Sequence, residues 1–131
     1  MKILNPEGWK PAKGYANGVQ ARGEIVVTGG LVGWNKDQVF ETDDFVGQCE
    51  QTFVNIVDVL KEAGASPENL VRLTWYITDK QEYLARPREL GEAYRRVIGR
   101  HFPAMAVVQV TALIEDRAKV EIEATAIIPD D

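Results

Sequence analysis

The chain has 131 residues, of which 45% are hydrophobic and 27% charged, and its net charge is −5. This composition is typical of one globular domain, so we treat residues 1–131 as a single domain and exclude a disordered chain. The acidic balance argues against binding to nucleic acid, and the basic stretch from Arg86 to Arg100 is interleaved with Glu89 and Glu92, which is typical of a solvated helix face with internal ion pairs.

Signals for export or for a membrane are also missing from the sequence. Residues 1–9 hold one lysine and no apolar run, which argues against a secretory signal. No segment approaches the ~20 apolar residues that would span a bilayer. Cys49 is the only cysteine, so no intrachain disulfide can form, and this fits a reducing compartment. We therefore expect a cytoplasmic protein with no membrane partner.

The first predicted elements are two short strands. Residues 5–14 contain two prolines and two glycines and are expected to be irregular. Gly18–Gln20 and Glu24–Thr28 are predicted to form a hairpin that turns around Arg22-Gly23.

A cluster of glycines follows the second strand and marks the first candidate site. Gly29, Gly30 and Gly33 break the strand and permit close approach of another group to the backbone, but they are too sparse to indicate phosphate binding. Trp34 comes directly after them. It would either cap an apolar or aromatic ligand or pack between subunits.

The central part of the chain predicts a helix and a strand. Thr42-Asp43-Asp44 is a good helix start, and apolar residues then recur every three or four positions from Phe45 to Leu60 until Gly64 ends the helix. A capped turn at Ser66-Pro67-Glu68 precedes a strand over Leu70–Thr78, which is rich in β-branched and aromatic residues.

The C-terminal third predicts a second helix and two more strands. Pro87 opens a helix that runs to Gly99. Strands are expected over Ala106–Leu113 and Lys119–Ile128, joined by a polar turn at residues 115–117.

The resulting order is β-β-α-β-α-β-β, which indicates an α+β fold. Two helices can cover only one face of such a sheet. The other face still carries apolar residues, and an uncovered apolar face predicts self-association, although scattered surface apolarity would look similar.

Several short motifs then follow one another from about residue 12 to residue 128. They are Gly14-Tyr15, Thr28-Gly29, Asn55-Ile56, Ala63-Gly64-Ala65, Pro103-Ala104 and Val120-Glu121-Ile122-Glu123-Ala124. In this order and spacing they resemble the RidA/YjgF family, also known as the L-PSP endoribonuclease-like family. The resemblance implies a chorismate-mutase-like fold and a homotrimer with a barrel-like centre. It also implies small-molecule sites in three clefts between the subunits.

The resemblance also implies an activity, the hydrolysis of enamines and imines such as 2-aminoacrylate to keto acids and ammonia. Tyr15 matches the pocket tyrosine of the family and Glu121 matches the glutamate that holds the attacking water, so both are candidate catalytic residues. Met105 stands where the carboxylate-binding arginine is expected, and a thioether cannot donate a hydrogen bond to a carboxylate. Gly91 stands where an asparagine is often found. With the backbone near Gly29 and Gly30, Met105 is a candidate substrate-binding position, as is Trp34.

Two functions therefore remain open. The first is a hydrolase or deaminase that acts on an imine, an enamine or a related small metabolite, with the usual 2-aminoacrylate activity not carried over because of Met105. The second is a non-catalytic trimer that binds a small metabolite in the same clefts. An endoribonuclease is disfavoured because the chain is acidic and His101 is its only histidine. The sequence contains neither a cluster with metal-ligand spacing nor a nucleotide-binding glycine motif, so no metal or cofactor is expected.

Overall fold

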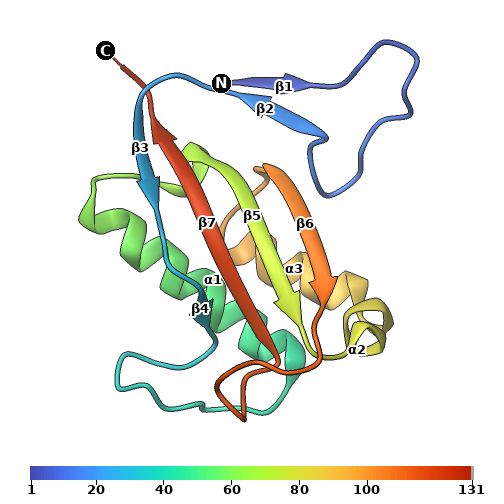
Figure 1. The fold of residues 1–131 in the computed structure, drawn as a ribbon, viewed down its shortest axis with the longest axis vertical. Helices are drawn as coiled ribbons and strands as arrows, with labels where there is room; N and C mark the ends of the chain where they lie inside the picture. The colour runs from blue at the N-terminus through green and yellow to red at the C-terminus, as the bar shows by residue number, and fades with distance from the viewer. Residues whose placement is uncertain (131) are drawn as a thin grey trace.

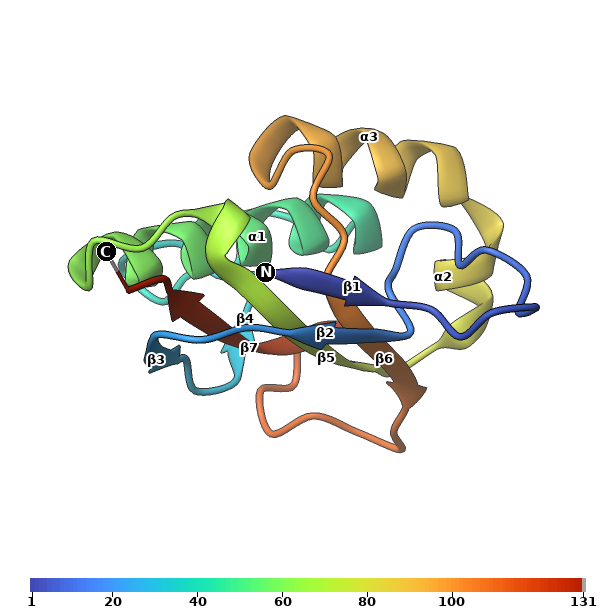
Figure 2. The same ribbon diagram turned by 90° about the horizontal axis from the view of Figure 1, so that it is seen from above.

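A mixed five-stranded sheet with helices on one face forms the body of the protein, as the computed structural model of residues 1–130 shows (Figures 1 and 2). In chain order the elements are β1 (Lys2–Leu4), β2 (Gly18–Gln20), β3 (Glu24–Val27), β4 (Leu31–Val32), α1 (Phe45–Glu62), the 3₁₀ turn η1 (Pro67–Asn69), β5 (Leu70–Ile77), α2 (Lys80–Ala85), α3 (Pro87–Val97), β6 (Ala104–Gln109) and β7 (Val120–Ile128). The predicted α+β class and the placement of the helices on one face are confirmed. None of the helices within residues 1–130 is long and apolar enough to cross a membrane.

The strand order of the sheet is β3-β7-β5-β6, and β4 continues the pairing of β3 along β7. β5 and β6 run parallel, while β3, β4 and β5 each pair antiparallel with β7. The last two strands, β6 and β7, follow one another in the chain, as predicted. In the sheet they are not neighbours, because β5 lies between them. β6 also ends at Gln109, earlier than the predicted Leu113.

The predicted hairpin around Arg22-Gly23 is wrong. β2 pairs instead with β1, a strand that the sequence pattern did not predict, and the two form a separate ribbon beside the main sheet (Figure 1). β3 pairs with β7, where Glu24 lies opposite Ile128. Gly23 has a φ of 146°, and a Cβ there would lie 1.9 Å from the carbonyl oxygen of Ile128. Glycine is therefore needed at position 23 because the chain passes close over the end of β7, and not because it forms a tight turn.

The first helix, α1, forms as predicted. The Asp44 side chain accepts a hydrogen bond from the Gly47 N–H at 2.9 Å and caps the N-terminus. Cys49, Phe53, Ile56 and Leu60 are fully buried against the sheet, and Gly64 follows the helix with a φ of +74°. The short turn η1 also lies where it was predicted.

The second helical region is split in two. The helix α3 begins at Pro87, as predicted, but the short helix α2 before it was not expected. Arg86 between them has a φ of −133°, because a residue that precedes proline is disfavoured in the helical conformation. The Asp79 side chain caps α2 by accepting the Gln81 N–H at 2.9 Å.

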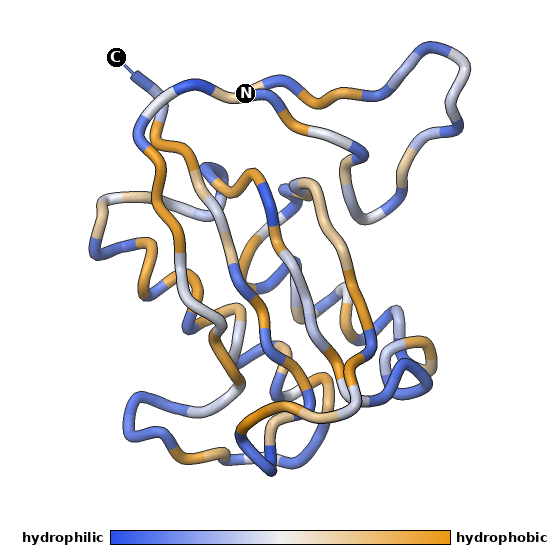
Figure 3. The backbone as a smooth tube through the Cα atoms, in the orientation of Figure 1, coloured by the Kyte–Doolittle hydropathy of each residue, from blue (hydrophilic) through white to orange (hydrophobic). Residues whose placement is uncertain are grey.

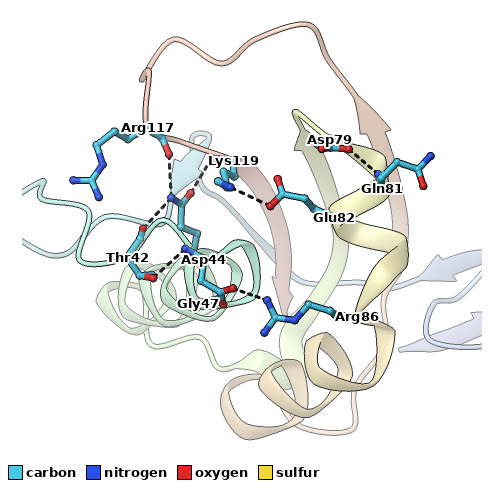
Figure 4. Close-up of polar contacts among 10 residues, drawn as sticks. Thr42, Asp44, Gly47, Asp79, Gln81, Glu82, Arg86, Arg117 and Lys119 are labelled. Carbon is cyan, nitrogen blue, oxygen red and sulfur yellow. Dashed lines mark hydrogen bonds and ion pairs between the residues drawn. The ribbon is translucent and has the colours of Figure 1, made fainter.

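Polar contacts join α1, α2 and the segment before β7 (Figure 4). The buried Gln48 side chain donates to the carbonyl of Arg117 at 3.0 Å and accepts the N–H of Lys119 at 2.8 Å. Lys119 in turn pairs with Glu82 of α2 at 3.0 Å. Because a buried amide without partners would cost stability, these bonds fix residues 117–119 against the helices.

One face of the sheet is left uncovered by helices. Along β7 the residues at positions 120, 122, 124 and 126 are buried towards the helices, while Glu121, Glu123 and Thr125 lie on the other face, as predicted. On that other face Ile25 and Val27 of β3 are 67% and 66% exposed. Figure 3 shows the apolar colour along this strand. Exposed apolar residues on a sheet face are typical of a contact surface.

Candidate functional site

A cleft of about 640 Å³ opens between α2, α3, the edge strand β6 and the loop before β2. Its wall is largely apolar and aromatic, and the residues that line it are Lys13, Gly14, Tyr15, Trp75, Tyr83, Leu84, Pro87, Leu90, Gly91, Tyr94, Arg95, Phe102, Met105 and Val107. The volume lies within the range of small-molecule sites, which is roughly 300–1,000 Å³.

Backbone pairing brings Tyr15 and Met105 to this cleft together. The N–H of Ala16 donates to the carbonyl oxygen of Pro103 at 3.0 Å, and Ala16 forms a parallel bridge with Ala104. Tyr15 precedes and Met105 follows this bridged pair, so the two residues lie diagonally across it at the edge of β6. Tyr15 remains 44% exposed, and Met105 is half-buried. The cleft is open with Met105 at the position where the family resemblance led us to expect an arginine.

A second group of candidate residues meets at β4 and β7. A Cβ on Gly30 would lie 2.2 Å from Oε2 of Glu121, so only glycine leaves the carboxylate its present place. Gly29 has no such neighbour, and its carbonyl accepts a hydrogen bond from Thr28 Oγ1 at 2.7 Å. The Glu121 side chain is half-buried here.

The two groups lie on opposite faces of the sheet within one chain. β5 separates β6 from β7, with Trp75 opposite both Val107 and Ile122, and Tyr76 opposite Val108 and Glu121. Side chains alternate between the faces of a sheet, so Met105 shares the helix-covered face with Trp75, and Glu121 lies on the uncovered face with Tyr76. One chain therefore does not bring Tyr15 and Met105 together with Glu121 and Gly30.

Tyr76 and Glu123 form a polar pair beside Glu121 that the sequence analysis did not single out. The Tyr76 hydroxyl donates to Glu123 Oε1 at 2.9 Å, and this carboxylate, with lesser contributions from burial and Glu121, raises the pKa of Tyr76. The alternation of β7 places Glu123 next to Glu121 on one face, which was visible in the sequence. That Tyr76 of β5 is its partner depends on the strand order, which was not visible in the sequence.

Trp34 lies apart from the cleft. Its ring packs against Phe40 at a centroid distance of 5.7 Å, in a small cluster with Val32, and the Asn55 side chain donates to its carbonyl oxygen at 2.8 Å. These contacts give Trp34 a packing role within its own chain, and its place as a ligand-capping residue stays a prediction.

The basic stretch forms ion pairs within itself, as predicted, and one with Glu50 of α1, which was not predicted. Arg88 pairs with Glu92 at 3.3 Å and Arg96 with Glu50 at 2.7 Å. Arg95 is exposed, as expected for a solvated face, and it also lines the cleft.

The side chains of Cys49 and His101 are held by the fold away from a reactive role. Cys49 is fully buried, and burial raises the pKa of its thiol far above the ordinary value, so it is held as a neutral thiol. His101 Nε2 lies 2.7 Å from the carbonyl oxygen of Leu70. Within residues 1–130 no three His, Cys, Asp or Glu side chains lie close enough together to hold a metal ion.

Comparison with known proteins places the chain in a family. The family model described as Endoribonuclease L-PSP matches residues 7–128. The chain belongs to the RidA/YjgF family. A RutC family protein from Aquifex aeolicus is 30% identical, over 96% of this chain and 98% of that protein. Among other RidA/YjgF relatives, the 2-iminobutanoate/2-iminopropanoate deaminase of Salmonella typhimurium is 28% identical over 86% of each chain.

Solved structures of the RidA/YjgF family confirm the fold. The protein of the conserved Rid family YyfB from Yersinia pestis has a TM-score of 0.83 and 28% sequence identity, and the match covers 97% of this chain and 98% of that one. The RidA-like fold implied by the sequence motifs is therefore present.

Proposed function

We propose that this RidA/YjgF protein is a homotrimeric hydrolase that removes ammonia from an imine, an enamine or a related small metabolite in clefts between its subunits. The observation that supports this most is the open cleft with Tyr15 and Met105 in its wall, because a decayed site without its arginine would have no reason to stay open. The deaminase name of several relatives supports the same class of reaction.

The site in this proposal is built from two copies of the chain. One copy supplies Tyr15 and Met105 at the edge of β6, and another supplies Glu121 with the Gly29-Gly30 backbone from its uncovered face. The exposed Ile25 and Val27 on that face favour burial against a partner. Each copy would then contribute both halves to different clefts, as a closed ring of identical subunits requires.

The chemistry proposed for the cleft needs few groups. Glu121 positions a water molecule and accepts a proton as the water oxygen adds to the carbon of the C=N bond, whose π electrons move to the nitrogen. The nitrogen takes up two protons in turn, one of them the proton that Glu121 accepted. The hydroxyl of the addition product then gives up its proton as the C–N bond breaks, and a carbonyl compound and ammonia leave. Backbone groups near Gly29, Gly30 and Met105 would polarise the substrate. Tyr15 would line the pocket beside the reacting carbon.

A second candidate is a non-catalytic trimer that binds a metabolite in the same clefts. Met105 favours it, because the thioether removes the charge that would hold a small carboxylate. The endoribonuclease in the name of the family model is not proposed, since an acidic chain repels RNA. We also propose a cytoplasmic location, where the single thiol of Cys49 stays reduced.

A hydrolysis assay separates the two candidates. Imines generated in solution by an amino acid oxidase are offered to the purified protein, and release of the keto acid is followed. We expect acceleration, and a loss of about a hundredfold or more in Glu121→Gln, because general acid–base groups typically contribute that much. Glu62→Gln, which removes the same charge at the far end of α1, should hydrolyse like the wild type. No acceleration by the wild type for any imine would favour the non-catalytic trimer.

A further inference from the structure

The charged side chains that line the cleft are all cationic. Lys13 and Arg95 contribute to its wall, and no Asp or Glu among residues 1–130 does, although the chain has 20 acidic residues against 15 basic ones. Burial raises the pKa of the two phenols Tyr83 and Tyr94 in the wall, so both stay neutral at physiological pH. The cleft is therefore a positive site on an acidic protein.

Arg95 is free to bind a ligand. Its neighbours on α3 are committed, since Arg88 pairs with Glu92 and Arg96 with Glu50. Arg95 makes no hydrogen bond or ion pair with any side chain or backbone group within residues 1–130. A guanidinium group offers five N–H donors in a planar fork that matches a carboxylate.

Gly91 determines where this guanidinium group lies. One turn before Arg95, a Cβ on Gly91 would come within 3.2 Å of Nη1 of Arg95. Gly91 itself lines the cleft, so the absence of its side chain lets the arginine lie along the wall. A Cβ at position 91 would crowd Nη1, so the guanidinium group would have to shift from this place.

The rest of the wall suits a bulky apolar body rather than a three-carbon acid. Trp75, Tyr94 and Phe102 supply aromatic surface, with the rings of Tyr94 and Phe102 stacked at 5.3 Å. The indole Nε1–H of Trp75 is buried and has no hydrogen-bond partner within the described chain.

We propose that the cleft binds an organic carboxylate with an aromatic or bulky apolar body, and that Arg95, assisted by Lys13, anchors its carboxylate. This inference rests on the proposed function, since it names the ligand class of the same cleft. Arg95 thereby supplies the charge that Met105 lacks, from α3 rather than from β6. The ligand would be the imine substrate or its keto acid product.

Three stable probes test the two parts of this ligand class by calorimetry. They are 3-phenylpropionate, its neutral amide 3-phenylpropanamide, and propionate. We expect 3-phenylpropionate to bind the wild type at least about tenfold more tightly than either of the others, because each lacks one of the two recognised parts. Equal binding of the acid and its amide, or no binding of the acid, would overturn the proposal.

Single-residue variants test which side chain anchors the carboxylate. In Arg95→Gln the affinity for 3-phenylpropionate should fall about tenfold and that for the amide should not change, because only the charge-assisted hydrogen bonds are lost. Arg100→Gln removes the same charge outside the cleft and should bind like the wild type. Gly91→Asn should weaken the acid alone by displacing the guanidinium group. Unchanged binding of the acid by Arg95→Gln would contradict an anchoring role.

The indole N–H signal of Trp75 and the hydrolysis assay complete the test. That signal should shift when 3-phenylpropionate binds, and no shift would place the ligand elsewhere. Hydrolysis without binding of 3-phenylpropionate would refute this inference and leave the proposed function standing. Binding of 3-phenylpropionate without hydrolysis of any imine would do the reverse.

Discussion

At the scale of single residues, glycines decide where the functional side chains lie. Gly30 leaves room for the Glu121 carboxylate, and Gly91 leaves room for the guanidinium group of Arg95. The sequence indicated a site near Gly29 and Gly30 because clustered glycines permit close approach. It did not indicate what would approach them, since the pairing of β4 with β7 joins segments about ninety positions apart.

Replacing Gly30 with alanine should move the Glu121 carboxylate. The new Cβ would lie 2.2 Å from Oε2 of Glu121, and that flexible side chain can swing away, so the free energy of unfolding should fall by only about 1 kcal/mol or less. The carbon chemical shifts of the Glu121 side chain should change, as measured by NMR.

Gly29→Ala is the matched comparison, because a Cβ there would meet no heavy atom within 4 Å. It should leave the Glu121 shifts in place. Identical spectra for Glu121 in both variants would show that the contact with Gly30 does not hold the carboxylate.

At the scale of elements, local signals predicted α1 and α3 well, but they missed α2 and predicted the strand pairing badly. α1 has a capping residue and a long apolar repeat, so its ends were predictable. β1 and β2 have three residues each, too few for a periodic signal, and β3 finds its partner at the far end of the chain. Gly23 was predicted to lie in a turn because turns and close backbone crossings both favour glycine.

Gly23→Ala should separate the start of β3 from the end of β7. Its Cβ would overlap the backbone oxygen of Ile128, which cannot swing away as a side chain can, and the φ of 146° is unfavourable for alanine. We expect the free energy of unfolding to fall by about 1–3 kcal/mol, measured by urea denaturation at a fixed protein concentration.

Gly8→Ala controls for the backbone cost alone. Gly8 also has a positive φ, of +87°, but a Cβ there would contact nothing within 4 Å. It should cost clearly less stability than Gly23→Ala. Equal losses would mean that the crossing over Ile128 does not contribute.

At the scale of the whole molecule, the family motifs predicted the fold, and the helix count predicted an uncovered sheet face. The sequence could not predict how Met105 lies relative to Glu121, because the strand order decides which residues share a face of the sheet. In one chain the two lie on opposite faces, with β5 between their strands. The proposed function therefore stands or falls with a cleft that two copies build together.

Cross-linking tests that composite cleft most directly and does not depend on activity. A variant with both Met105→Cys and Glu121→Cys is treated with a short bismaleimide and run on a denaturing gel, while Cys49 stays buried and unreactive. Because each chain would present one half-site to each neighbour, we expect covalent dimers and trimers and nothing larger. Single chains only, or a ladder that continues beyond three, would contradict a site built between the subunits of a trimer.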